Sequence, residues 1–191
     1  PYSLMNDKDY SILDDQGKYK WLEYYKASFL GKWYTAITKD LVLMTNAEFG
    51  FLGRYNKALG YSPFERYFVG GDGMASYQLD GRTTVALRGY ENGQISSVNG
   101  GTIYNKFQME LRYPITLKPS ASIYALTFLE AGNAYDGFEE LNPFNLKRSA
   151  GMGLRVFMPA FGLLGIDFAY GFDPMFGGTQ PSGWQTHFVI G

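Results

Sequence analysis

Hydrophobic and polar side chains alternate with a period of two along several stretches of the chain. Within the segment 103–115, every second residue of 106–113 is large and apolar, and the residues between them are polar or charged. The apolar set is Phe107, Met109, Leu111 and Tyr113, and the polar set is Lys106, Gln108, Glu110 and Arg112. Because successive side chains of a strand point to opposite faces, this pattern predicts a strand with one apolar and one polar face.

Seven segments of this kind predict an all-β fold. They lie at 21–37, 41–55, 103–115, 122–135, 148–158, 163–172 and 184–191. In the last two, large apolar residues again share one face while small or polar residues share the other. The composition agrees with strands and tight turns, because aromatic residues make up 18% of the chain and glycine occurs 24 times.

The connections between these segments alternate in length. Those at 38–40, 114–121 and 159–162 are short, and those at 56–102, 136–147 and 173–183 are long. In an antiparallel meander successive connections lie at opposite ends of the strands, so the short turns gather at one end and the long loops at the other. This asymmetry is typical of an antiparallel transmembrane β-barrel of the outer membrane. A soluble β-sandwich alternates in the same way and stays an alternative, with its apolar faces turned inward.

Charge and composition argue against several kinds of partner. The net charge is -1 and no basic run stands out, so we expect no nucleic acid partner. The chain has no cysteine, which excludes disulfides and thiolate metal sites, and the GGDG run at 70–73 with Asp80 lacks the spacing of an EF-hand. We therefore expect neither a metal nor a cofactor.

The number of strands indicates that these residues belong to something larger. Single-chain bacterial barrels have even strand counts, and seven antiparallel strands cannot close on themselves because the first and last run in the same direction. We therefore expect residues 1–191 to be the C-terminal part of one transmembrane β-barrel domain. Residues 1–20 then correspond to an external loop.

The connection 56–102 is too long and too apolar for a solvated loop tip. Loops of this length without secondary structure of their own are usually functional or disordered. We expect it to be an external loop that folds into the lumen of the barrel, where Arg88 would need acidic partners because an unpaired buried charge is costly. Glu110 is one candidate, and a hairpin around 114–121 would bring Glu130 onto its diagonal if Glu130 faces the lumen.

Six sequence blocks resemble, in order and spacing, the BamA family within the wider two-partner-secretion/BamA superfamily. The blocks are LRGY at 87–90, MELRYP at 109–114, FLEAGNAYD at 128–136, SAGMGLRVFMP at 149–159, LGIDFAYGF at 164–172 and THFVIG at 186–191. The resemblance covers residues 21–191 and implies the C-terminal portion, seven strands in all, of a barrel of about 16 strands. It also implies that the natural chain continues past Gly191 to a terminal aromatic residue.

The most specific block is the loop motif, which comprises Leu87, Arg88, Gly89 and Tyr90. It is similar to the family's Val-Arg-Gly-Phe/Tyr signature, whose arginine contacts acidic residues of the next two strands. The resemblance places those acidic partners at Glu110 and Glu130. Two positions depart from the family pattern, because Leu87 replaces valine and Glu130 replaces an expected aspartate, which alters the reach of that contact.

The resemblance further implies a role without covalent chemistry. It implies the central barrel subunit of the outer-membrane protein assembly machinery, located in the bacterial cell outer membrane of a Gram-negative cell. Its expected partners are the outer-membrane lipid bilayer, nascent outer-membrane proteins and accessory assembly lipoproteins. The nascent outer-membrane proteins would be folded and inserted at a weak seam, or lateral gate, between the first and last strands of the barrel, where a substrate strand can add to an open edge.

The part of that seam present in this chain is the last predicted strand. The seam strand consists of Trp184, Gln185, Thr186, His187, Phe188, Val189, Ile190 and Gly191. It follows a Pro-Ser-Gly run at 181–183, and a glycine near the start of a strand loosens its pairing.

Two further functions remain alternatives at the level of sequence. A related two-partner secretion or translocation barrel would carry the same signature loop and act as a transporter. A barrel enzyme would need a histidine with a serine or aspartate on the polar face, and His187 with Asp167 on the neighbouring strand is the one such pair. We do not expect an enzyme, because a histidine hydrogen-bonded to a carboxylate is a common structural pair.

Overall fold

Seven long antiparallel strands form one sheet. The computed structural model describes residues 1–5, 8–74 and 81–191. The sheet order is β1-β2-β5-β6-β7-β8-β9. The strands are β1 (Tyr25–Ala36), β2 (Val42–Gly53), β5 (Ile103–Lys118), β6 (Ala121–Tyr135), β7 (Lys147–Met158), β8 (Gly162–Pro174) and β9 (Pro181–Ile190). The prediction of an all-β, antiparallel fold is confirmed, and each of the seven predicted segments coincides with one of these strands.

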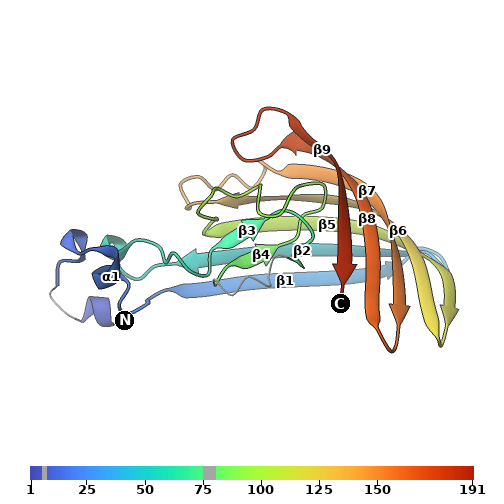
Figure 1. The fold of residues 1–191 in the computed structure, drawn as a ribbon, viewed down its shortest axis with the longest axis horizontal. Helices are drawn as coiled ribbons and strands as arrows, with labels where there is room; N and C mark the ends of the chain where they lie inside the picture. The colour runs from blue at the N-terminus through green and yellow to red at the C-terminus, as the bar shows by residue number, and fades with distance from the viewer. Residues whose placement is uncertain (6–7, 75–80) are drawn as a thin grey trace.

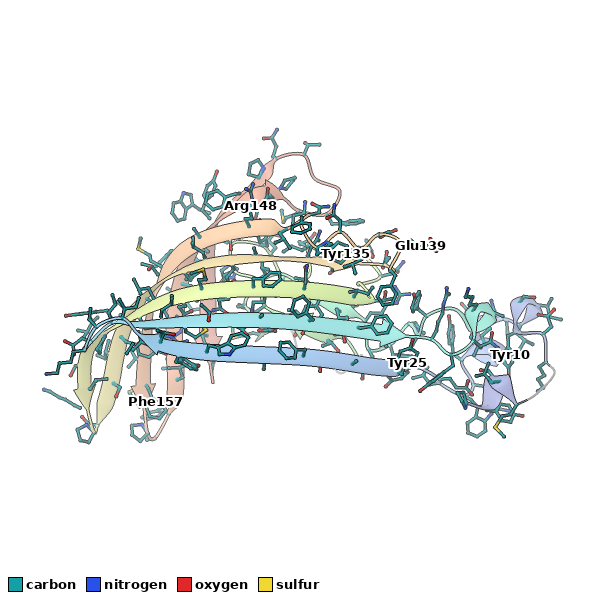
Figure 2. The ribbon with its side chains drawn as sticks, turned by 180° about the vertical axis from the view of Figure 1, so that it is seen from behind. Tyr10, Tyr25, Tyr135, Glu139, Arg148 and Phe157 are labelled. Atoms are coloured by element: carbon teal, nitrogen blue, oxygen red, sulfur yellow. The ribbon has the colours of Figure 1, made fainter. Side chains whose placement is uncertain are left out.

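The sheet is a curved wall with two different faces. Figure 1 shows β1 to β9 sweeping round in sequence order, with the green segment that contains β3 and β4 lying on one side of the wall. We call the side that carries this segment the inner face and the opposite side the outer face. Figure 2 shows the outer face from behind, with many side chains, aromatic rings among them, projecting from the strands.

Burial on the two faces is the reverse of that in a soluble sandwich. On β5 the apolar Met109 and Tyr113 are about half exposed, whereas Lys106 and Glu110 on the opposite face are buried. Phe168 and Phe188 continue the exposed apolar set on β8 and β9. A large exposed apolar surface around a charged interior matches strands that face lipid. The apolar rows therefore do not form the dry core that the sandwich alternative requires.

The predicted alternation of short and long connections is confirmed, with small shifts at some strand ends. The short connections are 37–41, 119–120 and 159–161, and the long ones are 54–102, 136–146 and 175–180. The first strand begins at Tyr25 rather than at residue 21. The last begins at Pro181 rather than Trp184, because the pairing with β8 resumes beyond a register shift between Gly171 and Pro174.

The long connection is more regular than we predicted. It contains the 3-10 turn η3 (Lys57–Leu59) and two three-residue strands, β3 (Tyr67–Val69) and β4 (Thr83–Val85), which pair in parallel. Tyr67 also exchanges two backbone hydrogen bonds with Gly101. The expectation of a loop without secondary structure was therefore wrong, since several segments of the connection pair with one another. Residues 75–80 of this connection, including Asp80 of the GGDG hypothesis, lie outside the described residues.

An apolar cluster joins this connection to the inner face. Its buried members are Leu52, Tyr67, Val69, Val85, Leu87, Tyr90, Ile95 and Tyr104. Leu52 belongs to β2 and Tyr104 to β5, and the other six come from the long connection. Burying these side chains against the wall is the main apolar contribution to docking, because each fully buried large side chain is worth about 1.5–3 kcal/mol.

The N-terminal segment is a separate small feature beyond the start of β1. It contains η1 (Tyr2–Leu4), η2 (Tyr10–Ile12) and the short helix α1 (Asp15–Lys18), whose N-terminus is capped by Asp14 accepting from the Gly17 N–H. Residues 6–7 lie outside the described part of the chain. Tyr19 donates to the carbonyl of Tyr61, so this segment touches the start of the long connection. Among the described residues, no helix has the length and apolarity needed to cross a membrane.

Candidate functional site

The loop motif lies against the inner face of the wall. Leu87 exchanges two backbone hydrogen bonds with Gly71, which fixes the motif within the long connection. Both Leu87 and Tyr90 are fully buried, and Arg88 is 6% exposed. A guanidinium placed this deep requires partners, because removing an uncompensated charge from water is unfavourable by several kcal/mol.

Three carboxylates from three strands surround Arg88. Glu130 on β6 accepts three hydrogen bonds, from the backbone N–H of Arg88 at 2.7 Å, from Nε at 2.9 Å and from Nη2 at 2.7 Å. Glu110 on β5 accepts from Nη2 at 3.1 Å, and Asp167 on β8 accepts from Nη1 at 3.0 Å. The Phe128 ring on β6 lies beneath the guanidinium, 3.4 Å from Cζ to the ring centre. The donors of Arg88 are thus divided among several strands of the wall.

The two predicted carboxylates therefore meet Arg88, in the arrangement of a paired hairpin. Glu110 is the cross-strand neighbour of Phe128, which puts Glu130 two residues further along the same face of β6. The added length of a glutamate at 130 does not weaken the contact, since Glu130 accepts more hydrogen bonds from Arg88 than either other carboxylate does. Sequence reasoning missed Asp167 as a third partner.

Two more arginines balance the carboxylates. Arg155 on β7 donates twice to Asp167, with both distances 2.6 Å, and Arg112 on β5 donates to Glu110 at 2.6 Å. We call the set of Arg88, Arg112, Arg155, Glu110, Glu130 and Asp167 the charged cluster. It holds three guanidiniums and three carboxylates, so its formal charge is zero. Among the described hydrogen bonds, Glu130 accepts from one guanidinium, that of Arg88. Glu110 and Asp167 each accept from a second arginine as well.

The charged form of Arg88 is favoured despite its burial. Desolvation alone would lower the pKa of Arg88, but the charge of Glu130, its hydrogen bonds and the charges of Asp167 and Glu110 together raise that pKa above its ordinary value. For Tyr90, also in the loop motif, the neutral form is favoured instead, because burial raises the pKa of its hydroxyl to about 12. The motif therefore presents one fixed cation and one neutral hydroxyl to the wall.

Gly89 allows the loop backbone to approach the wall closely. Its φ is +87°, a left-handed conformation that favours glycine, and a Cβ there would lie 2.8 Å from Cβ of Ser149 on β7. A Cβ on Gly171 of β8 would in turn collide with the carbonyl oxygen of Gly89. The Gly89 N–H donates to Nε2 of His187 on β9 at 2.9 Å. Two glycines facing each other thus bring the motif into contact with the end of the sheet.

The remaining motif residues hold the loop on either side of Arg88. The Tyr90 hydroxyl donates to the carbonyl of Arg148 at 2.6 Å and accepts from the N–H of Asp173 at 3.4 Å. Figure 2 places Arg148 at the same end of the sheet as Tyr135, which is the end where the long connections lie. A Cβ on Gly132 would lie 2.6 Å from Cδ1 of Leu87, so this glycine of β6 makes room for the leucine.

Small residues on β7 and β8 make room for the charged cluster. A Cβ on Gly153 would overlap the Asp167 carboxylate, and a Cβ on Gly165 would lie 2.6 Å from Cδ of Arg155. Gly153 is the cross-strand partner of Asp167, and Gly165 that of Arg155. A charged residue directly opposite a glycine on the polar face was therefore the signal that could have identified Asp167 and Arg155 from the sequence.

The hypothetical dyad of His187 and Asp167 is not the arrangement found. The two residues are cross-strand partners, but the Asp167 carboxylate accepts from Arg88 and Arg155, and Nε2 of His187 accepts from Gly89. A nucleophile activated by this histidine would need the Nε2 lone pair that Gly89 occupies. In the part of the chain that the structure describes, no group of three histidine or acidic side chains is arranged to hold a metal ion.

The seam strand presents its alternate residues as predicted. Trp184, Thr186, Phe188 and Ile190 are exposed on the outer face, while Gln185, His187 and Val189 are buried or half-buried. Gly191 lies outside β9, yet it exchanges two backbone hydrogen bonds with Leu163. Gly183 has a φ of +76°, next to the register shift in the pairing with β8. The strand is therefore regular from Trp184 onward and irregular before it.

Comparison with known proteins identifies the family. Residues 13–191 match the family described as the Omp85 superfamily domain. The outer membrane protein assembly factor BamA of Neisseria meningitidis serogroup B (strain ATCC BAA-335 / MC58) is 25% identical over 131 residues, which are 61% of this chain and 14% of that protein. The crystal structure of BamA from Haemophilus ducreyi lacking POTRA domains 1–3 shares the fold, with a TM-score of 0.65 and 19% identity over 87% of this chain and 35% of that one.

The match to an outer-membrane family agrees with the apolar outer face and the charged inner face of the wall. The chain spans about a seventh of the curated relative and about a third of the solved structure. Its apolar outer face and charged inner face fit a strand wall in the outer membrane of a Gram-negative bacterium. The chain belongs to the Omp85 superfamily, and its strand wall resembles part of the BamA barrel.

Proposed function

We propose that this chain is the C-terminal part of the barrel of a BamA-type assembly factor, which folds and inserts other β-barrel proteins into the outer membrane. The inner face would line the lumen of the complete barrel, and the loop 56–102 would be an external loop folded into that lumen. The observation that carries the proposal is the attachment of Arg88 to carboxylates of three wall strands. It supports a loop held in one position while the outer face remains available to lipid.

The proposed activity requires no covalent chemistry. A substrate strand would add its backbone to the free edge of the seam strand, as in other cases of strand addition. The partners would be the lipid bilayer, nascent outer-membrane proteins and accessory assembly lipoproteins.

A transporter of the two-partner secretion type is the second candidate. It would need an open path along the inner face for its substrate. In this structure the docked loop buries Leu87 and Tyr90 against that face, so a transporter would have to move the loop to open the path.

The test is a complementation experiment with the full-length gene. In cells depleted of the native protein, the wild-type gene should restore folded outer-membrane proteins, measured by their heat-modifiable mobility on gels. The R88A variant should reach the membrane but restore folding poorly. Unimpaired assembly by R88A would contradict the role of the loop, and a wild-type gene that restores secretion of an exported passenger without restoring barrel folding would favour the transporter.

A further inference from the structure

The loop motif and the last strand are joined by one hydrogen bond whose acceptor can titrate. Gly89 donates its backbone N–H to Nε2 of His187 on β9 at 2.9 Å. His187 is the sole histidine of the chain. Among the described residues, this is the hydrogen bond that connects the four motif residues to β9, since the others lead to Gly71 and to β5, β6, β7 and β8.

We propose that His187 is a positioning residue that fixes the loop motif against the last strand, and that it does so in its neutral form. A neutral imidazole accepts at Nε2 when its proton is on Nδ1, whereas an imidazolium has two donors and no acceptor. Protonation would therefore place an N–H of the ring against the N–H of Gly89. The contact is made above the pKa of His187 and is lost below it.

The surroundings make this contact hard to replace. His187 is 5% exposed, and the backbone of Gly89 lies close to both β7 and β8, because a Cβ on Gly89 would lie 2.8 Å from Cβ of Ser149 and 3.0 Å from the backbone nitrogen of Gly171. A buried N–H left without an acceptor is unfavourable. Protonation of His187 would therefore weaken the docking of the loop against the wall.

Other charged groups near the imidazole of His187 could also respond to pH. His187 borders a polar cavity of about 210 Å3, which Asp72 of the loop, Glu130 of β6, Arg155 of β7 and Asp167 of β8 also line, together with Arg88. The carboxylates of Glu130 and Asp167 are each hydrogen-bonded to guanidiniums, whereas Nε2 of His187 has the Gly89 N–H. A variant that changes His187 alone separates its effect from that of the carboxylates.

This coupling does not depend on the assembly function and holds equally for a transporter. It has a mechanical consequence, because any outward movement of β9 withdraws the acceptor from Gly89. Loop docking and the position of the last strand would then favour each other. Such reciprocity is required of any two sites that share one contact.

The test is limited proteolysis of the loop in the full-length protein, in membranes, between pH ~8 and pH ~5, a range over which histidine titrates. Wild-type protein should be cleaved about tenfold faster at the acidic end, which corresponds to about 1.4 kcal/mol. H187Q keeps an acceptor but cannot titrate, so its protection should persist in acid. H187L should be cleaved rapidly at both pH values, and Q185A, on the same face of β9, should follow the wild type.

Two results would overturn the proposal. If H187Q lost its protection in acid as the wild type does, the response would come from the carboxylates and not from His187. If H187L stayed protected at neutral pH while its barrel remained folded by heat-modifiable mobility, the hydrogen bond to Gly89 would not position the loop. H187Q serves as the decisive variant if H187L does not fold, because it preserves size and polarity.

Discussion

The wall and the loop that lies on it are stabilised in different ways. Neighbouring strands of the wall pair along most of their length, as β5 and β6 do on both sides of one register shift between Pro114 and Thr116, so the stability of the wall is spread over many equivalent backbone hydrogen bonds. The loop motif is held by a few side chains, chiefly Arg88, and by two glycines that permit close contact. Single substitutions should therefore displace the loop while leaving the wall nearly unchanged.

Removal of Arg88 should produce the largest effect. R88A leaves Glu130 buried without its guanidinium, and breaking a buried ion pair in this way costs about 3–5 kcal/mol. Loop cleavage by protease in the full-length protein should rise by orders of magnitude, with the barrel still folded. R148A is the matched control, because Arg148 pairs with Asp173 at an exposed position, and its cleavage rate should equal that of the wild type. If the loop were equally protected from protease in R88A and wild type, Arg88 would not be what holds the loop on the wall.

A wedge between loop and wall should have an intermediate effect without any change of charge. In G171A the new methyl group would meet the carbonyl oxygen of Gly89 and, less closely, Cβ of Ser182 on β9, so the motif and the start of β9 must shift, at about 1–3 kcal/mol. Faster loop cleavage is expected, with the contacts between Arg155 and Asp167 retained. G137A is the control, since a Cβ there would meet nothing within 4 Å apart from its own chain neighbours. If both variants behaved alike, close approach of the backbones would not matter.

Loss of one hydroxyl should have the smallest effect. Y90F keeps the buried ring but removes the hydrogen bond to the Arg148 carbonyl, worth about 1 kcal/mol. The cleavage rate should rise a few-fold, measured in the same assay. A change as large as that of R88A would mean that Tyr90, and not the charged cluster, determines loop docking.

The same contrast explains what could be predicted from the sequence. The wall follows from alternation, because period two fixes both the strand and its faces, as in 103–115. The start of β9 was misplaced because Gly183 and the register shift interrupt that pattern. The parallel pairing of β3 with β4 was not predictable, since strands of three residues are specified by their packing against the wall and not by their own sequence.

The part of the site that depends on one hairpin and on the family resemblance could be predicted from the sequence. Glu110 and Glu130 follow from one hairpin and its register. Asp167 and His187 come from strands far along the chain, and their contacts with Arg88 and Gly89 depend on the curvature of the whole sheet. Alternation places a residue on a face but does not state which residue of another segment it meets.

A double-mutant cycle between Arg88 and Glu130 tests the central claim most directly. The claim is that the guanidinium pins the loop to wall carboxylates, of which Glu130 accepts the most hydrogen bonds from it. Loop-docking free energies would be measured by protease protection for wild type, R88A, E130A and the double variant. The account predicts a coupling energy of at least about 1.5 kcal/mol. Additive effects, with a coupling energy below about 0.5 kcal/mol, would contradict it.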